Sequence, residues 1–137
     1  MSIKVNGSCL CEKIKFVLLG PFDQFHLCHC SRCRKSTGSA HTSIIFAKPE
    51  NIQWVSGTEF IKRFDLPEAE RFAKSFCTEC GSAVPHTTGD GQLLLIPAGL
   101  LEDDPVIRPQ DKIFWKDRAE WHDDNAMTAP CFDSYPT

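Results

Sequence analysis

Seven of the eight cysteines in this chain lie in three short groups. The groups span Cys9–Cys11, Cys28–Cys33 and Cys77–Cys80 and hold two, three and two cysteines. Cysteines so close in sequence can turn their sulfur atoms toward one centre, as a tetrahedral metal ion requires. Seven sulfurs divide into a set of four and a set of three. A four-sulfur zinc site is closed and structural, whereas three protein ligands leave a position for a substrate, so the set of three predicts an enzyme.

The composition is that of one globular domain spanning residues 1–137. At 137 residues the chain has the size of a single domain, and 42% hydrophobic residues suffice for a core. The net charge of -3 argues against nucleic acid as a partner, because binding to a phosphate backbone favours a basic surface. The longest apolar stretch, residues 93–98, is too short to span a bilayer, so no membrane partner is expected.

The N-terminal residues lack the apolar segment of a secretory signal, so a cytoplasmic location is expected. In a reducing compartment, clustered cysteines more often hold metal than form disulfides. A disulfide framework is the less favoured alternative, because cysteines in a C-x-C pair are awkward to bridge. An iron–sulfur centre is also less favoured, because seven thiolates do not make two four-ligand clusters. A sulfur-rich ligand set selects zinc over magnesium or calcium.

Apolar residues alternate with polar ones along much of the chain, which predicts an all-β or β-rich fold. The turn of a helix is expected only at 31–38, where Gly38 would end it, and near 116–120. Proline and glycine clusters separate the segments. Strands are predicted in segments 3–5, 14–18, 22–28, 42–46, 52–55, 59–64, 71–76, 82–87 and 93–98.

Two assignments of the metal ligands are open from the residues alone. In the first, the closed site is formed by Cys9, Cys11, Cys77 and Cys80. The open site is formed by the central triplet, Cys28, Cys30 and Cys33. In the second, the triplet gains a fourth ligand. The first is better motivated, because a cross-link across residues 12–76 restrains the unfolded chain strongly. Fourth-ligand candidates in the second are Cys131, His26, His29, His41 and His86.

Several sequence motifs resemble those of one known family. They are G-S-C-x-C at 7–11, C-H-C-x-x-C-R-K-x-T-G-S-A at 28–40, F-C-x-x-C-G-S at 76–82 and A-G-L-L-x-D-D at 98–104. The segments 113–114 and 118–121 are similar to the C-terminal motif of the same family. Together these motifs resemble the glutathione-dependent formaldehyde-activating enzyme family, which also includes centromere protein V.

This resemblance implies a β-tent fold of stacked antiparallel sheets with zinc knuckles and two zinc ions per chain. A structural zinc is implied on Cys9, Cys11, Cys77 and Cys80, and a catalytic-type zinc on Cys28, Cys30 and Cys33. The implied activity is that of a carbon–sulfur lyase, with glutathione as co-substrate and a small thiol or aldehyde-derived ligand as partner. One departure is Glu12, where the family usually carries glycine. If the backbone there has a positive φ, the glutamate is strained.

Three further expectations concern a basic cluster, two histidines and the alternative function. Arg32, Arg34 and Lys35 can bind the carboxylates of a glutathione-like ligand or form a solvated loop face. His41 and His86 are expected to be structural histidines with satisfied hydrogen bonds. The alternative to an enzyme is a non-catalytic, zinc-stabilised binding module, as in the non-enzymatic branch of the family.

Overall fold

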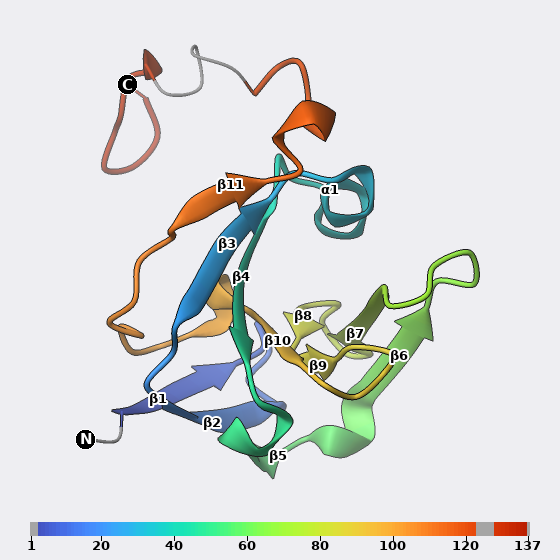
Figure 1. The fold of residues 1–137 in the computed structure, drawn as a ribbon. Coiled ribbons are helices and arrows are strands. Elements are labelled where there is room, and N and C mark those ends of the chain that lie inside the picture. The colour runs from blue at the N-terminus through green and yellow to red at the C-terminus, as the bar shows by residue number, and fades with distance from the viewer. Residues whose placement is uncertain (1–2, 123–127, 137) are drawn as a thin grey trace.

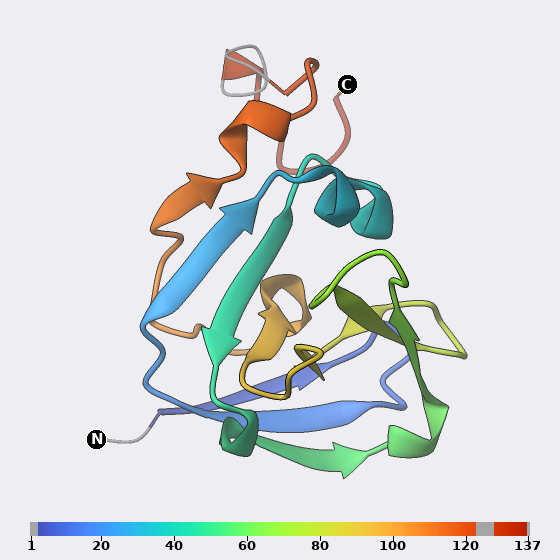
Figure 2. The same cartoon turned by 45° about the vertical axis from the view of Figure 1, so that its right-hand side comes forward.

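The structure, a computed structural model, describes residues 3–122 and 128–136. Its strands form three sheets, which Figures 1 and 2 show from two sides. The first sheet has the order β1 (Ile3–Ser8), β2 (Lys15–Gly20), β5 (Ile52–Ser56). The second has the order β11 (Asp111–Ile113), β3 (Gln24–Cys28), β4 (Thr42–Ala47), β10 (Leu94–Pro97), β9 (His86–Thr87). The third has the order β6 (Ile61–Asp65), β7 (Ala73–Cys77), β8 (Ala83–Val84).

Helical structure is limited to short segments in the described residues. The α-helix α1 spans Ser31–Thr37, and Gly38 ends it in the left-handed conformation with φ 66°, as predicted. The 3-10 turns are η1 (Pro49–Asn51), η2 (Thr58–Phe60), η3 (Ala98–Leu100) and η4 (Trp115–Asp117). No helix in the described ranges is long and apolar enough to cross a membrane. The β-rich fold of stacked sheets with cysteine knuckles is therefore confirmed.

The main core lies between the first two sheets. Alternation along β1 and β2 turns one side of each strand inward, so Val5, Phe16 and Leu18 are almost fully buried. They meet Ile45 and Ile96 from the second sheet. In Figures 1 and 2, β3 and β4 rise steeply from the layer of β1 and β2, and α1 follows the upper end of β3. The core thus supports the strands that carry the central cysteine group.

A second, smaller core lies at the ends of the first and third sheets. It contains Ile14 and Val84 together with two cysteines, Cys9 and Cys77, each at most 2% exposed. Partly buried Trp54 packs against both cores. Two of the predicted metal-binding cysteines are therefore also core residues, and the local packing depends on how their sulfur atoms are satisfied.

Two sequence predictions about strands are corrected by the structure. The predicted strand 82–87 is divided at Pro85: β8 pairs with β7 in the third sheet, and β9 pairs with β10 in the second. Proline lacks an N–H group and cannot continue a hydrogen-bonded ladder. The expectation of purely antiparallel sheets also fails at one edge, because β11 pairs with β3 in parallel. No strand was predicted at β11, and its parallel pairing brings the C-terminal region beside the end of β3.

Candidate metal centres and the adjoining cavity

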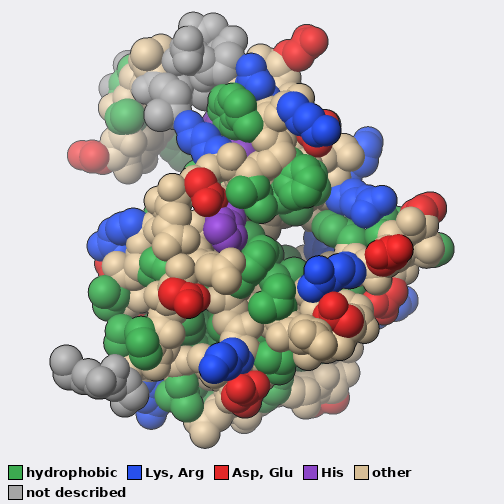
Figure 3. Space-filling model, viewed as in Figure 1, with side chains coloured by type: hydrophobic (Ala, Val, Ile, Leu, Met, Phe, Trp, Pro, Cys, Tyr) green, Lys and Arg blue, Asp and Glu red, His purple; other side chains and the backbone are tan. Residues whose placement is uncertain are grey.

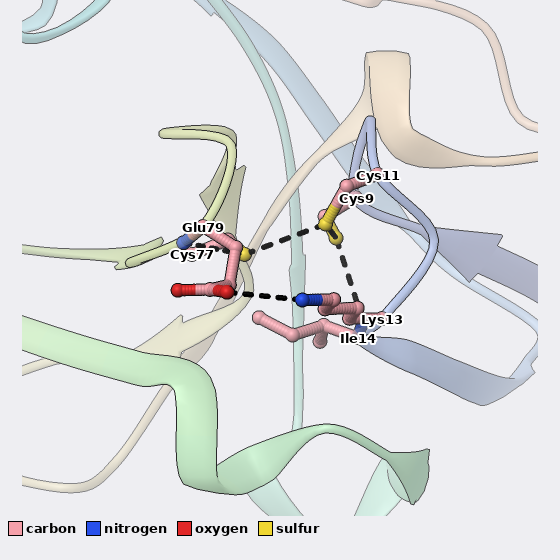
Figure 4. A network of polar contacts seen from close by, with 6 residues as sticks. All are labelled: Cys9, Cys11, Lys13, Ile14, Cys77 and Glu79. Carbon is pink, nitrogen blue, oxygen red and sulfur yellow. Dashed lines mark hydrogen bonds and ion pairs between the residues drawn. The ribbon is translucent and has the colours of Figure 1, made fainter.

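Cys9, Cys11, Cys77 and Cys80 come together at the meeting of two turns. Their four sulfur atoms all lie within 4.8 Å of one another. The sulfur of Cys11 is 3.6 Å from that of Cys9 and 3.8 Å from that of Cys77 (Figure 4). One turn joins β1 to β2, and the other joins β7 to β8. This arrangement brings four cysteine sulfurs from two distant parts of the chain close enough to hold one metal ion, in the grouping of the first ligand assignment.

Backbone amides stabilise both turns by donating to sulfur. The amide of Ile14 donates to the sulfur of Cys9 at 3.4 Å, and that of Glu79 donates to the sulfur of Cys77 at 3.4 Å. Between the turns, Lys13 Nζ forms an ion pair with Glu79 Oε1 at 2.9 Å (Figure 4). Amide–sulfur hydrogen bonds favour the thiolate, which is the form that binds metal. The polar surroundings of the four sulfurs therefore fit a metal ion.

The second turn also favours an ionised thiol at neutral pH. Hydrogen bonds with the side chain and backbone of Ser82 lower the pKa of Cys80 to about 5. The Ser82 hydroxyl in turn accepts from the amide of Leu10 at 2.9 Å, which links the two turns directly. A thiolate is thus available in this cluster before any ion binds.

The residue that follows the last cysteine has a positive φ in both turns. Gly81 has φ 79° and Glu12 has φ 66°. A side chain in this conformation costs about 1–2 kcal/mol, which glycine avoids. The strain predicted for a positive φ at Glu12 is therefore confirmed. It lies next to Cys11, in the four-cysteine cluster.

Reciprocal substitutions at these two positions test this strain. We expect Glu12→Gly to raise the free energy of unfolding by about 1 kcal/mol, because the left-handed conformation no longer carries a penalty. Gly81→Ala, whose added Cβ would have no neighbour within 4 Å, should lower it by about 1 kcal/mol. Urea unfolding at a fixed zinc concentration measures both. A destabilised Glu12→Gly protein would contradict this explanation.

Cys28, Cys30 and Cys33 form a separate group at the upper end of β3. Their sulfur atoms also lie within 4.8 Å of one another, and no fourth Cys, His, Asp or Glu among residues 3–122 and 128–136 joins them. Cys28 is buried, whereas Cys30 and Cys33 are partly exposed. The Cys30 sulfur accepts from the Cys33 amide at 3.3 Å and so caps the N-terminus of α1. In the described part of the chain, this group is therefore a three-sulfur set on a fixed turn.

The sulfurs of this group share protons unequally. The side-chain hydrogen bond with Cys33 lowers the pKa of Cys28 to about 6. The same contact, together with burial, raises the pKa of Cys33. A Cys28 thiolate at neutral pH beside a protonated Cys33 is a starting point for metal binding, in which the remaining protons are released.

The three-cysteine group lines a large cavity. The cavity has a volume of about 750 Å³, and Cys28, Cys30 and Cys33 all contribute to its wall. Figure 3 shows the molecule hollowed between its upper part and the lobe at right, with hydrophobic side chains around the hollow. The apolar wall includes Ile44, Phe46, Phe72, Ala73, Val84, Leu93, Leu95, Pro97, Ile113 and Phe114. The four-cysteine cluster contributes no residue to this wall.

The predicted basic cluster is divided by the structure. Arg32 lines the cavity, whereas Arg34 and Lys35 do not. Two other cations, Arg71 and Lys74, do line it. Sequence reasoning missed both, because they lie just before and within β7, far in sequence from the three cysteines of the same cavity wall. Lys74 Nζ donates to the backbone oxygen of Ser36 in α1, which brings the third sheet against the helix.

His86 also lines the cavity, and the satisfied hydrogen bonding that was predicted for it is only partly present. Its Nε2 is buried without a hydrogen-bond partner among the described residues. Burial lowers the pKa of His86 to about 4, with the positive charge of Arg63 as a smaller cause. The imidazole is therefore neutral over the physiological pH range.

This pKa predicts an acid-sensitive contribution to stability. An unfolded histidine titrates near pH 6.5, so between about pH 6.5 and pH 4 the unfolded chain binds a proton that folded His86 resists. The free energy of unfolding should fall by up to about 3 kcal/mol as the pH is lowered through this window. The difference between wild type and His86→Gln, measured by urea unfolding with excess zinc at each pH, isolates this effect from metal release. Parallel pH profiles for the two proteins would contradict it.

Comparison with known proteins identifies the family. The family described as glutathione-dependent formaldehyde-activating enzyme matches residues 4–117. The chain belongs to this family. The crystal structure of a Rhodobacter sphaeroides protein, a structural genomics target, is similar with a TM-score of 0.58 and 21% identity. The match covers 78% of this chain and 97% of that one, and it supports the fold alone. No curated protein matches the chain significantly.

Proposed function

We propose that this protein is a zinc-dependent enzyme of the carbon–sulfur lyase type that acts on thiol adducts of small aldehydes. This proposal depends mainly on one observation: the three-sulfur group lines a large cavity, whereas none of the four cysteines of the other group does. Family membership favours glutathione as the thiol and formaldehyde as the aldehyde. The reaction joins the thiol sulfur to the carbonyl carbon, and the thiol proton passes to the carbonyl oxygen.

The two cysteine groups have different roles in this proposal. Cys9, Cys11, Cys77 and Cys80 hold a structural zinc. Cys28, Cys30 and Cys33 hold a second zinc at the cavity wall. A zinc ion held there would act as a Lewis acid and would favour the thiolate form of a substrate thiol at neutral pH. The helix α1 and strand β3 fix the three ligands, because the Cys30 sulfur also caps the helix.

The cavity favours a substrate much larger than formaldehyde. Its volume of about 750 Å³ lies in the range of about 300–1,000 Å³ that suits drug-sized ligands. The thiol component would therefore fill most of it. Arg32, Arg71 and Lys74 line the cavity and can bind carboxylates such as the two of glutathione.

Substitution of one cysteine in each group separates the two metal roles. We expect Cys77→Ser to unfold the domain, because a structural zinc contributes about 10 kcal/mol, as much as the whole stability of a typical domain. Cys30→Ser should lose one zinc per chain and keep the fold, because serine retains the helix cap. Elemental analysis and circular dichroism measure the two effects. Equal loss of structure in both variants would contradict the division of roles.

Catalysis is tested by the rate at which thiol and aldehyde exchange with their adduct. NMR exchange spectroscopy on glutathione with formaldehyde should show faster interconversion in the presence of the zinc-loaded protein. Cys30→Ser should reduce this acceleration by more than about 100-fold, since even loss of a group behind a metal ligand costs about 10–100-fold. Cys131→Ser is the matched control and should stay active, because Cys131 is exposed and outside both groups.

The same assay distinguishes the alternative function. If a panel of thiols and small aldehydes shows no acceleration, while the protein still binds zinc and folds, the protein is a zinc-stabilised binding module. If the Cys30→Ser protein accelerated the exchange as much as wild type does, the three-cysteine group would have no part in the mechanism.

A further inference from the structure

We propose that His29, His41 and His122 form a third metal site, distinct from both cysteine groups. One ring nitrogen from each lies within 4.8 Å of one from each of the others. The ring centroids are 4.9 Å apart for His29 and His41, 5.2 Å for His29 and His122, and 5.8 Å for His41 and His122. Three imidazoles around one point are a common ligand set for zinc and other late first-row metal ions.

The strand register explains why these rings meet. In the antiparallel pair of β3 and β4, Cys28 lies opposite Thr42, so the next residues outward, His29 and His41, also face each other. The amide of His29 donates to the backbone oxygen of Ile113 at 3.0 Å, which holds the end of β11 beside it. The turn η4 follows and leads to His122. Three segments of the chain thus converge on one point.

The hydrogen bonding of these rings is incomplete without a ligand. His29 is 0% exposed, and neither of its ring nitrogens has a hydrogen-bond partner among the described residues. Nδ1 of His41 is also buried and unpartnered, contrary to the satisfied histidine that the sequence predicted. Each buried unsatisfied polar group costs about 1–3 kcal/mol. A metal ion at the centre would accept the free lone pairs and remove part of this cost.

Neighbouring residues fix the rings and set the charge around them. Trp115 packs edge to face against His29, with centroids 4.9 Å apart. Lys112 Nζ and Arg118 Cζ lie over the Trp115 ring, at 5.0 and 4.5 Å from its centroid. These two cations repel a dication bound at the cluster, which makes this site weaker than the thiolate sites.

The site is chemically separable from the cysteine groups. Its ligands are nitrogen atoms, whereas the other groups supply only sulfur. A Co²⁺ ion bound by imidazoles shows visible d–d absorption without the near-ultraviolet charge-transfer band that thiolate ligands produce. Zinc binds thiolate sites more tightly than cobalt, so zinc already bound there stays in place during a cobalt titration.

The test is a Co²⁺ titration of protein preloaded with two equivalents of zinc. Wild type should bind one further ion with d–d bands and no thiolate charge-transfer band. His122→Gln should weaken this binding by about 100-fold or more, because losing a direct ligand should cost more than loss of a residue behind a ligand, which costs about 10–100-fold. His122 is chosen because it is partly exposed and its substitution spares the core. His26→Gln is the control and should bind as wild type does, because His26 pairs with Asp111 outside the cluster.

Three results would overturn the proposal. Wild type that binds no third ion, a third ion whose spectrum contains thiolate charge transfer, or equal affinity in His122→Gln and wild type each contradicts it. A second readout is limited proteolysis of the segment after η4. Co²⁺ should slow cleavage there in wild type and leave the rate in His122→Gln unchanged, and equal protection of both proteins would also contradict the site.

Discussion

The structure depends on the junction of two turns, one between β1 and β2 and the other between β7 and β8. The junction brings Cys9 and Cys77 into a small core with Ile14 and Val84, and the sulfur atoms form part of that packing. A thiol is only a weak donor and a weak acceptor, so four thiols within 4.8 Å of one another satisfy each other poorly. A metal ion bound by all four would satisfy them at once. The small core therefore combines apolar burial with a polar centre.

The two cysteine groups differ less in chemistry than in position. Both receive amide–sulfur hydrogen bonds, and both contain one thiol whose pKa is well below its usual value. The four-cysteine cluster lies between two sheets, where two of its members are core residues. The three-cysteine group lies at the end of β3, with the cavity on one side. The fold thus places the four-cysteine cluster where it can hold two sheets together, and the three-cysteine group where it can bind a ligand in the cavity.

Sequence reasoning succeeded where a pattern is local. The alternation in β1 and β2, the short helix closed by Gly38 and the cysteine spacings all depend on residues close in the chain. It failed where contacts between segments distant in the chain determine the structure. The three residues of β11 are mostly exposed and carry no apolar alternation, so only their parallel pairing with β3 makes them a strand. Arg71 and Lys74 were missed as cavity residues for the same reason.

The histidine cluster is another long-range contact, and it lies beside the turn that carries the three-cysteine group. The backbone at Cys30 is extended, with φ -65° and ψ 158°, and β3 ends at Cys28. Side chains in an extended segment alternate in direction, so Cys28 and Cys30 point to one side and His29 to the other. Because the three residues are consecutive, any contact that fixes the His29 ring also restrains the two cysteines beside it. Residues 113–122, which contact His29 through Ile113, Trp115 and His122, therefore help to fix the positions of Cys28 and Cys30.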